Sequence, residues 1–175
     1  SLVFLVMAFL HAVFLNPNIN PTFKNNDLRY ALNAALDKKR IIEEVLNEEV
    51  PIALSPFLSQ FTEGINNNLE IAFDINEAKN RIAKIENQNI ELNLVVPKIS
   101  FLEKTAEIMK SSWESIGIKK VNLYFLDPDE LRNEVIKTNN YEMLLFGNIL
   151  ENPIDLFAFW HSSQRFYPGL NLSLY

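Results

Sequence analysis

Between residues 90 and 146 the sequence alternates strand patterns with helix patterns, and this alternation limits the possible folds more than any other feature. The stretches 90–96, 120–126 and 141–147 are typical of β-strands, and apolar residues at helical spacing fill both gaps between them. Helices that connect successive strands require parallel pairing with right-handed crossovers. We therefore expect an α/β fold, with a mixed, mostly parallel sheet flanked by helices.

Capping patterns mark where the two crossover helices begin and end. Ser100, with Glu103 three residues later, has the spacing of a capping box, and Gly117 is the expected residue just past the end of that helix. Asp127 stands before Pro128, which favours the first position of the second crossover helix. The two helices should therefore start close to the ends of the strands that precede them.

Upstream of this unit, apolar spacing predicts helices near residues 28–36, 37–46 and 74–85. The first 15 residues are an apolar run, shorter than the roughly 20 that cross a bilayer, with neither a basic start nor a cleavage pattern. We interpret this run as one or two buried β segments, with a truncated signal or anchor as the alternative. A start at Ser1, without a polar lead-in, suggests a chain cut from a longer protein.

Composition excludes several classes of function. The 175 residues carry a net charge of −6, which argues against nucleic-acid binding, since phosphates need a basic surface. The sequence has no cysteine, so disulfides, thiolate nucleophiles and zinc–cysteine sites are excluded. The length fits one domain or a piece of a larger one.

Neither catalysis nor metal binding finds support in the sequence. His161 is next to Ser162, but adjacent side chains on one segment point apart, and no G-x-S-x-G motif is present. His11 and His161 are the only histidines, and no metal-ligand spacing surrounds them. We therefore expect no catalytic residue, no metal, no cofactor and no enzymatic activity.

The parallel strands nevertheless predict where a ligand would bind. In such sheets ligands bind beyond the carboxyl ends of the strands, which points to the loops 97–100, 126–127 and 147–152. Aromatic residues crowd 157–167 just after the last of these loops; we expect most of them in the core, whereas one or two could line a ligand pocket. Trp160 is the candidate for the core or the wall of a cleft.

Five segments, in order, resemble the family 5 extracytoplasmic solute-binding proteins, the peptide- and nickel-binding proteins of ABC importers. The resemblance covers residues 23–175, nearly the whole chain. The similar segments are "FKNNDLRYALNAALDKKRIIEEVL", "FDINEAKNRIA", "IELNLVVP" with "AEIMKSSWESIGIKKVNLYFLD", "YEMLLFGNILENPIDLFAFWHSSQ" and "GLNLSLY".

The resemblance implies a lobe of the type II periplasmic-binding-protein fold in a partial protein. Residues 1–22 would be strands leading in from the hinge, and 23–175 an incomplete C-terminal lobe. The implied function is peptide capture for an ABC importer, by closure of two lobes. The implied partners are a peptide or other small solute and a membrane permease, not nucleic acid. The resemblance further implies a monomer in the periplasm or lipid-anchored at the outer face of the cell membrane.

The resemblance also implies ligand-binding residues near the last strand. Glu151, four residues after Gly147, could pair with the amino terminus of a peptide, or could stabilise the start of a helix near 152–160. Alternatives for the whole lobe are another solute, such as a nickel chelate, a sugar or haem, or a signalling or scaffold role. The expected ligand-binding set is Phe146, Gly147, Asn148, Glu151, Trp160 and Asn171.

Overall fold

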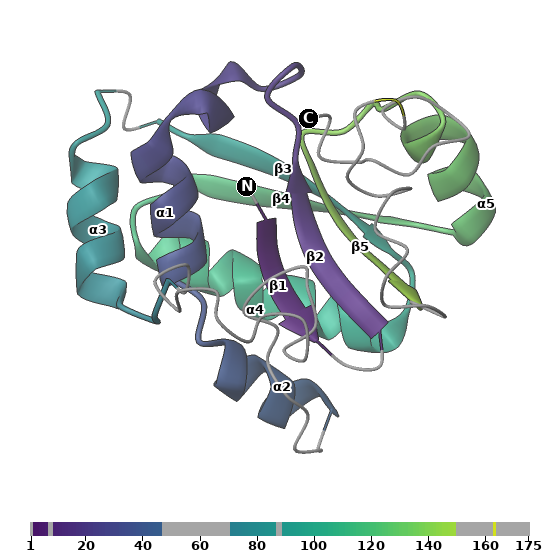
Figure 1. Cartoon of the computed structure of the whole chain (residues 1–175), viewed down its shortest axis with the longest axis horizontal. Helices are drawn as coiled ribbons and strands as arrows, with labels where there is room; N and C mark the ends of the chain where they lie inside the picture. The colour runs from purple at the N-terminus through teal and green to yellow at the C-terminus, as the bar shows by residue number, and fades with distance from the viewer. Residues whose placement is uncertain (1, 7–8, 47–70, 87–88, 150–162, 164–175) are drawn as a thin grey trace.

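The computed structural model describes residues 2–6, 9–46, 71–86, 89–149 and 163. Its centre is a five-stranded sheet with the order β1-β2-β5-β3-β4. Figure 1 shows β1, β2 and β5 turned steeply relative to β4, the twist expected of such a sheet. The strands are β1 (Leu2–Val6), β2 (Phe9–Leu15), β3 (Glu91–Pro97), β4 (Lys120–Leu126) and β5 (Met143–Ile149).

The parallel unit predicted from the sequence is present. β3 pairs in parallel with both β4 and β5, so β3 lies between them although β4 precedes β5 in the chain. The crossover from β3 to β4 is α4 (Ser100–Ser115), and that from β4 to β5 contains α5 (Pro128–Glu130) and the π-helical η4 (Leu131–Ile136). The α/β class with a mixed sheet is therefore confirmed.

The apolar N-terminal run forms a β-hairpin, as the strand interpretation predicted. β1 pairs antiparallel with β2, and β2 pairs antiparallel with β5 over its whole length, from Phe9 opposite Ile149 to Leu15 opposite Met143. The sheet is thus parallel on one side of β5 and antiparallel on the other. In the part of the chain that the structure describes, no helix is both long and apolar enough to cross a membrane.

Helices pack on both faces of the sheet because side chains alternate along each strand. On one face, Leu92, Leu94 and Val96 of β3 are buried in the larger core under α1 (Asn26–Ala34), α2 (Lys38–Leu46), α3 (Ile75–Ala83) and α4. On the other face, Val95 joins a smaller core with Leu131 and Val135 of η4. Figure 1 shows α1 and α3 at one end of the sheet and α5 at the other.

The observed caps correct one expectation. Asp74 caps α3 as predicted, accepting bonds from the N–H groups of Asn76 and Glu77. The Ser100–Glu103 capping box does not form, because α4 begins at Ser100 and its N-cap is Ile99, which has no side chain able to accept a hydrogen bond. Asp127 is the N-cap of α5, although its carboxylate makes no capping bond.

Candidate functional site

The carboxyl ends of β3, β4 and β5 meet at one edge of the sheet, here called the rim. Pro97 at the end of β3 pairs with Leu126 at the end of β4, and β5 runs in the same direction beside β3. β2 starts at this edge, since Phe9 pairs with Ile149. The ends of the three parallel strands therefore share one edge, as a shared ligand edge requires. The predicted loop 147–152 begins later than expected, because β5 continues to Ile149 and residues 150–152 lie outside the described residues.

A cation and an anion stand at the centre of the rim. Lys98 directly follows β3, and Asp127 directly follows β4. The Lys98 Nζ lies 3.7 Å from Oδ1 of Asp127. A backbone bond of 2.9 Å from the Lys98 N–H to the Leu126 carbonyl fixes the two loops together. Both side chains are more than half exposed, at 58% and 68%, so the pair is weak and both charges can reach a solute.

The start of α4 adds positive potential next to Lys98. Ile99 is the N-cap of this 16-residue helix and makes no side-chain capping bond. The helix dipole places partial positive charge at that end. Ile99 itself is 42% exposed, so the middle of the rim combines an apolar side chain, a cation and a helix start.

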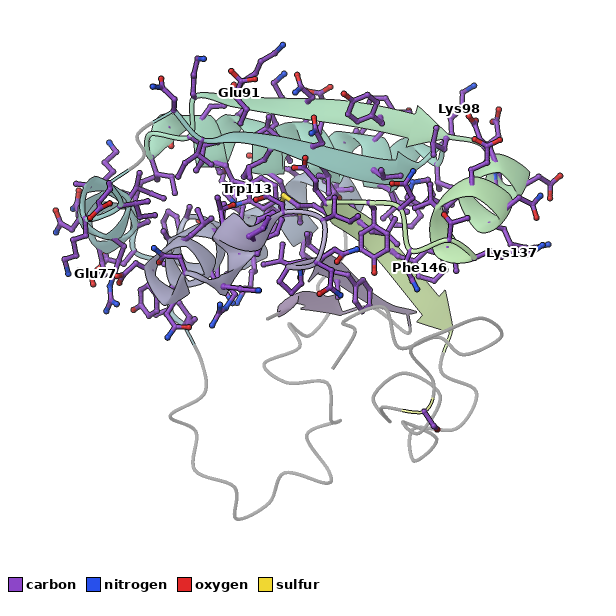
Figure 2. The ribbon with its side chains drawn as sticks, turned by 90° about the horizontal axis from the view of Figure 1, so that it is seen from above. Glu77, Glu91, Lys98, Trp113, Lys137 and Phe146 are labelled. Carbon is purple, nitrogen blue, oxygen red and sulfur yellow. The ribbon has the colours of Figure 1, made fainter. Side chains whose placement is uncertain are left out.

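Of the six predicted ligand-binding residues, the structure places three on β5 near the rim. Phe146 is half-buried against the smaller core, on the sheet face that η4 covers. Gly147 is half-buried and pairs with His11, and Asn148 pairs with Leu10. Figure 2 shows Phe146 and Lys98 toward the same end of the sheet. Whether these residues bind a ligand stays a prediction.

The other three predicted residues, Glu151, Trp160 and Asn171, lie outside the described residues, as does His161. The sequence predicted that the loops holding Lys98 and Asp127 face a ligand, but it did not predict either of these two residues as a ligand-binding residue. A charged residue directly after each of two parallel strands was the signal that could have found them, because strand ends at one edge bring such residues together.

Polar side chains hold the opposite end of the sheet in register. The carboxylate of Glu142, just before β5, accepts a 2.8 Å bond from the Asn93 amide on β3 and a 3.2 Å bond from the Asn20 amide. Asn122 on β4 donates to Asn93 over 3.0 Å. This network joins the three parallel strands at their starts, so the far ends that form the rim are positioned by a rigid sheet.

Ionisable groups with perturbed pKa values lie mostly away from the rim. Burial raises the pKa of the Tyr141 hydroxyl. The hydrogen bond from Lys119 lowers the pKa of Glu91, at the opposite end of β3. In the described ranges, no three His, Cys, Asp or Glu side chains are grouped so that they could hold a metal ion. The rim therefore offers charge and shape to a ligand, in loops fixed by the sheet.

Comparison with known families gives a match over most of the chain. Residues 7–166 match the model of the bacterial extracellular solute-binding proteins, family 5 (middle region). The chain belongs to this family. The family resemblance stated from the sequence segments is thereby confirmed. No curated protein matches the chain.

Several solved structures share the fold. CtaP, an ABC transporter substrate-binding protein of Listeria monocytogenes, aligns with a TM-score of 0.78 at 24% identity, over 100% of this chain and 36% of its own. The oligopeptide-binding protein AppA of Bacillus subtilis, solved with a nonapeptide, aligns with a TM-score of 0.78 at 20% identity, over 100% and 38%.

NikZ of Campylobacter jejuni, solved with Ni(L-His), aligns with a TM-score of 0.77 at 18% identity, over 100% of this chain and 38% of its own. The chain thus spans little more than a third of the length of these three proteins. At this level of identity the likeness establishes the fold, which is a lobe of the type II periplasmic-binding-protein kind.

Proposed function

We propose that the chain forms most of one lobe of the solute-capturing component of a peptide ABC importer. The observation that carries this proposal is the rim, where three parallel strands of a family 5 fold end around Lys98 and Asp127. Such a component is extracytoplasmic, binds by closure of two lobes, delivers the solute to a membrane permease and catalyses no reaction. Residues 1–22 would lead in from the hinge and 23–175 would form the lobe.

The charges of the rim favour a solute with both an amine and a carboxylate. Lys98 and the start of α4 suit a carboxylate, whereas Asp127 suits an ammonium group. A peptide has both groups and a polar main chain that loops can hold through direct or water-mediated hydrogen bonds. The residues Phe146, Gly147 and Asn148 would form the wall of the same edge, with Glu151, Trp160 and Asn171 contributing from the segment that follows.

The test is calorimetry of the complete protein with a mixed peptide library. We expect binding with a negative heat-capacity change, because the two lobes bury apolar surface on closing. The absence of any heat with peptides would contradict the proposal. Hydrolysis of model peptides that disappears in His161→Ala would contradict the non-enzymatic part of it.

A second candidate solute is a metal chelate. NikZ, solved with Ni(L-His), matches this chain with a TM-score of 0.77, nearly the same as the oligopeptide-binding AppA at 0.78. The same calorimetric experiment with nickel–histidine separates the two candidates. Tight binding of the chelate without binding of peptides would favour the chelate.

A further inference from the structure

β4 is an edge strand whose outer backbone groups have a defined direction. Within the described sheet β4 pairs with β3 alone. The Leu126 carbonyl accepts from Lys98 and so points toward β3. Because backbone direction alternates along a strand, the N–H and C=O groups of Val121, Leu123 and Phe125 point away from β3. Such an edge is a template for pairing with a second chain.

Glu114 occupies the first of these outward groups. Its carboxylate Oε1 accepts a 2.9 Å hydrogen bond from the Val121 N–H. Glu114 is in the last turn of α4, and Lys110 Nζ lies 3.9 Å from the same oxygen. The Glu114 side chain is 34% exposed. A negative group is therefore fixed on the edge that the described sheet leaves unpaired, where an incoming strand would need a donor.

The rest of the edge is suited to antiparallel pairing with a second copy of this chain. A two-fold pairing centred on Leu123 would place Val121 opposite the second copy's Phe125, a residue that is 37% exposed. The same register places Lys119 opposite the second copy's Asp127, which adds opposite charges at both ends. This pairing requires the Val121 N–H to donate to the second copy's Phe125 carbonyl.

We propose that Glu114 keeps the chain from associating with a second copy through β4. Its carboxylate holds the Val121 N–H that the pairing needs and puts negative charge where the second copy's carbonyl oxygen would lie. Natural sheets protect exposed edges with charged side chains in this way. The side chain of Glu114 thus acts on the sheet edge from the end of the helix that packs against it.

Sedimentation velocity at increasing protein concentration tests this proposal with three variants. Glu114→Ala frees the Val121 N–H, and we expect it to shift from monomer to dimer. Glu114→Gln keeps an oxygen that accepts the same bond, and we expect it to stay monomeric. The double variant Glu114→Ala/Leu123→Pro lacks the central outward N–H, and we expect it to return to monomer, since proline is tolerated where an edge N–H faces solvent.

A monomeric Glu114→Ala at every concentration would overturn the proposal, as would a dimer that the added Leu123→Pro fails to dissociate. Amide hydrogen exchange on the unmodified chain gives a test that requires no variant to fold. We expect the Val121 amide to exchange more slowly than the amides of Leu123 and Phe125. Equal exchange at the three amides would also overturn the proposal.

Discussion

Trp113 ties a helix end to the core through its indole. Its side chain is fully buried, and its Nε1 donates a 2.8 Å bond to the carbonyl of Leu32, close to the end of α1. Carbonyls in the last turn of a helix lack an intrahelical partner, so the indole satisfies one of them away from water. One side chain of α4 therefore fixes where α1 lies.

We predict that Trp113→Phe lowers the free energy of unfolding by about 1–3 kcal/mol, because the Leu32 carbonyl loses a buried donor. Chemical denaturation measures the change. Met109→Leu is the matched control, since Met109 is equally buried on α4 but has no polar hydrogen, and should cost less than about 1.5 kcal/mol. Equal losses in both variants would show that the hydrogen bond contributes nothing.

Gly117 ends α4 in a conformation that other residues adopt at a cost. Its φ is +110°, and an added Cβ would lie 3.3 Å from Cγ2 of Ile82 on α3. We predict that Gly117→Ala lowers the unfolding free energy by more than about 1 kcal/mol. Ser115→Ala, an exposed position two residues earlier, should stay within about 0.5 kcal/mol of the parent. A fully stable Gly117→Ala would contradict the strain argument.

Tyr141 makes stability depend on alkaline pH. Burial raises the pKa of its hydroxyl above the ordinary value of 10.0, so the folded state favours the neutral form. The resulting stabilisation is complete below pH 10 and is lost as the pH rises, because the unfolded chain releases the proton first. We predict that Tyr141→Phe weakens the fall in melting temperature above about pH 10. An unchanged fall in Tyr141→Phe would contradict this role of the buried hydroxyl.

At the scale of elements, Arg81 clamps α3 to α1. Its Nε lies 2.6 Å from Glu77 on the same helix, its Nη1 lies 2.7 Å from Asp27 on α1, and its guanidinium lies 4.4 Å from the ring centre of Tyr30. The hydrogen bonds with the two carboxylates raise the pKa of Arg81. The planar guanidinium makes all three contacts at once, which a lysine cannot.

We predict that Arg81→Lys lowers the melting temperature, and that added salt reduces the difference from the parent, since the side chain is about a third exposed. Thermal denaturation at low and high ionic strength measures both effects. Lys79→Ala, at an exposed position on α3, is the control and should have no effect. A difference that salt leaves unchanged would point to packing rather than charge.

The sequence predicted most elements because their signals are local. Apolar spacing located the helices, alternation or a short apolar run located the strands, and Asp74 and Gly117 marked a start and an end correctly. The Ser100–Glu103 spacing was misleading, because the polypeptide becomes helical right after Ile99. A capping pattern says which residues could cap, whereas the position of the preceding strand decides which residue does.

At the scale of the whole molecule, the charge of Lys98 should set which solutes bind. We predict that Lys98→Glu in the complete protein weakens binding of a free-carboxylate peptide at least about tenfold, by replacing attraction with repulsion. Calorimetry measures the change. A C-terminally amidated peptide should show a smaller difference between parent and variant.

Lys79→Glu is the control for Lys98→Glu, because it changes the net charge equally on α3, which lies at one end of the sheet in Figure 1. Its affinity for the peptide should equal that of the parent. Unchanged affinity in Lys98→Glu would place the solute elsewhere on the lobe.

The arrangement of the strands was beyond the reach of local patterns. Three strands joined by two crossovers are compatible with several strand orders. Nothing in residues 120–147 indicates that β5 pairs with β3 and not with β4. The antiparallel pairing of β2 with β5 joins residues far apart in the chain. The apolar residues of β2 do not alternate with polar ones, so no pattern reveals which face is buried. For the site, the loops followed from the fold, but Lys98 and Asp127 become neighbours only once strand order and register are known.

The pairing of Phe9 with Ile149 has a consequence for how the chain is made. Ribosomes add about 5–20 residues per second and release the N-terminal part first. The apolar β1–β2 hairpin therefore leaves the ribosomal exit tunnel many seconds before β5, its neighbour in the sheet, has been synthesised. Until β5 is made, the backbone groups of β2 that pair with it have no partner in the described sheet, and such an edge can pair with another chain.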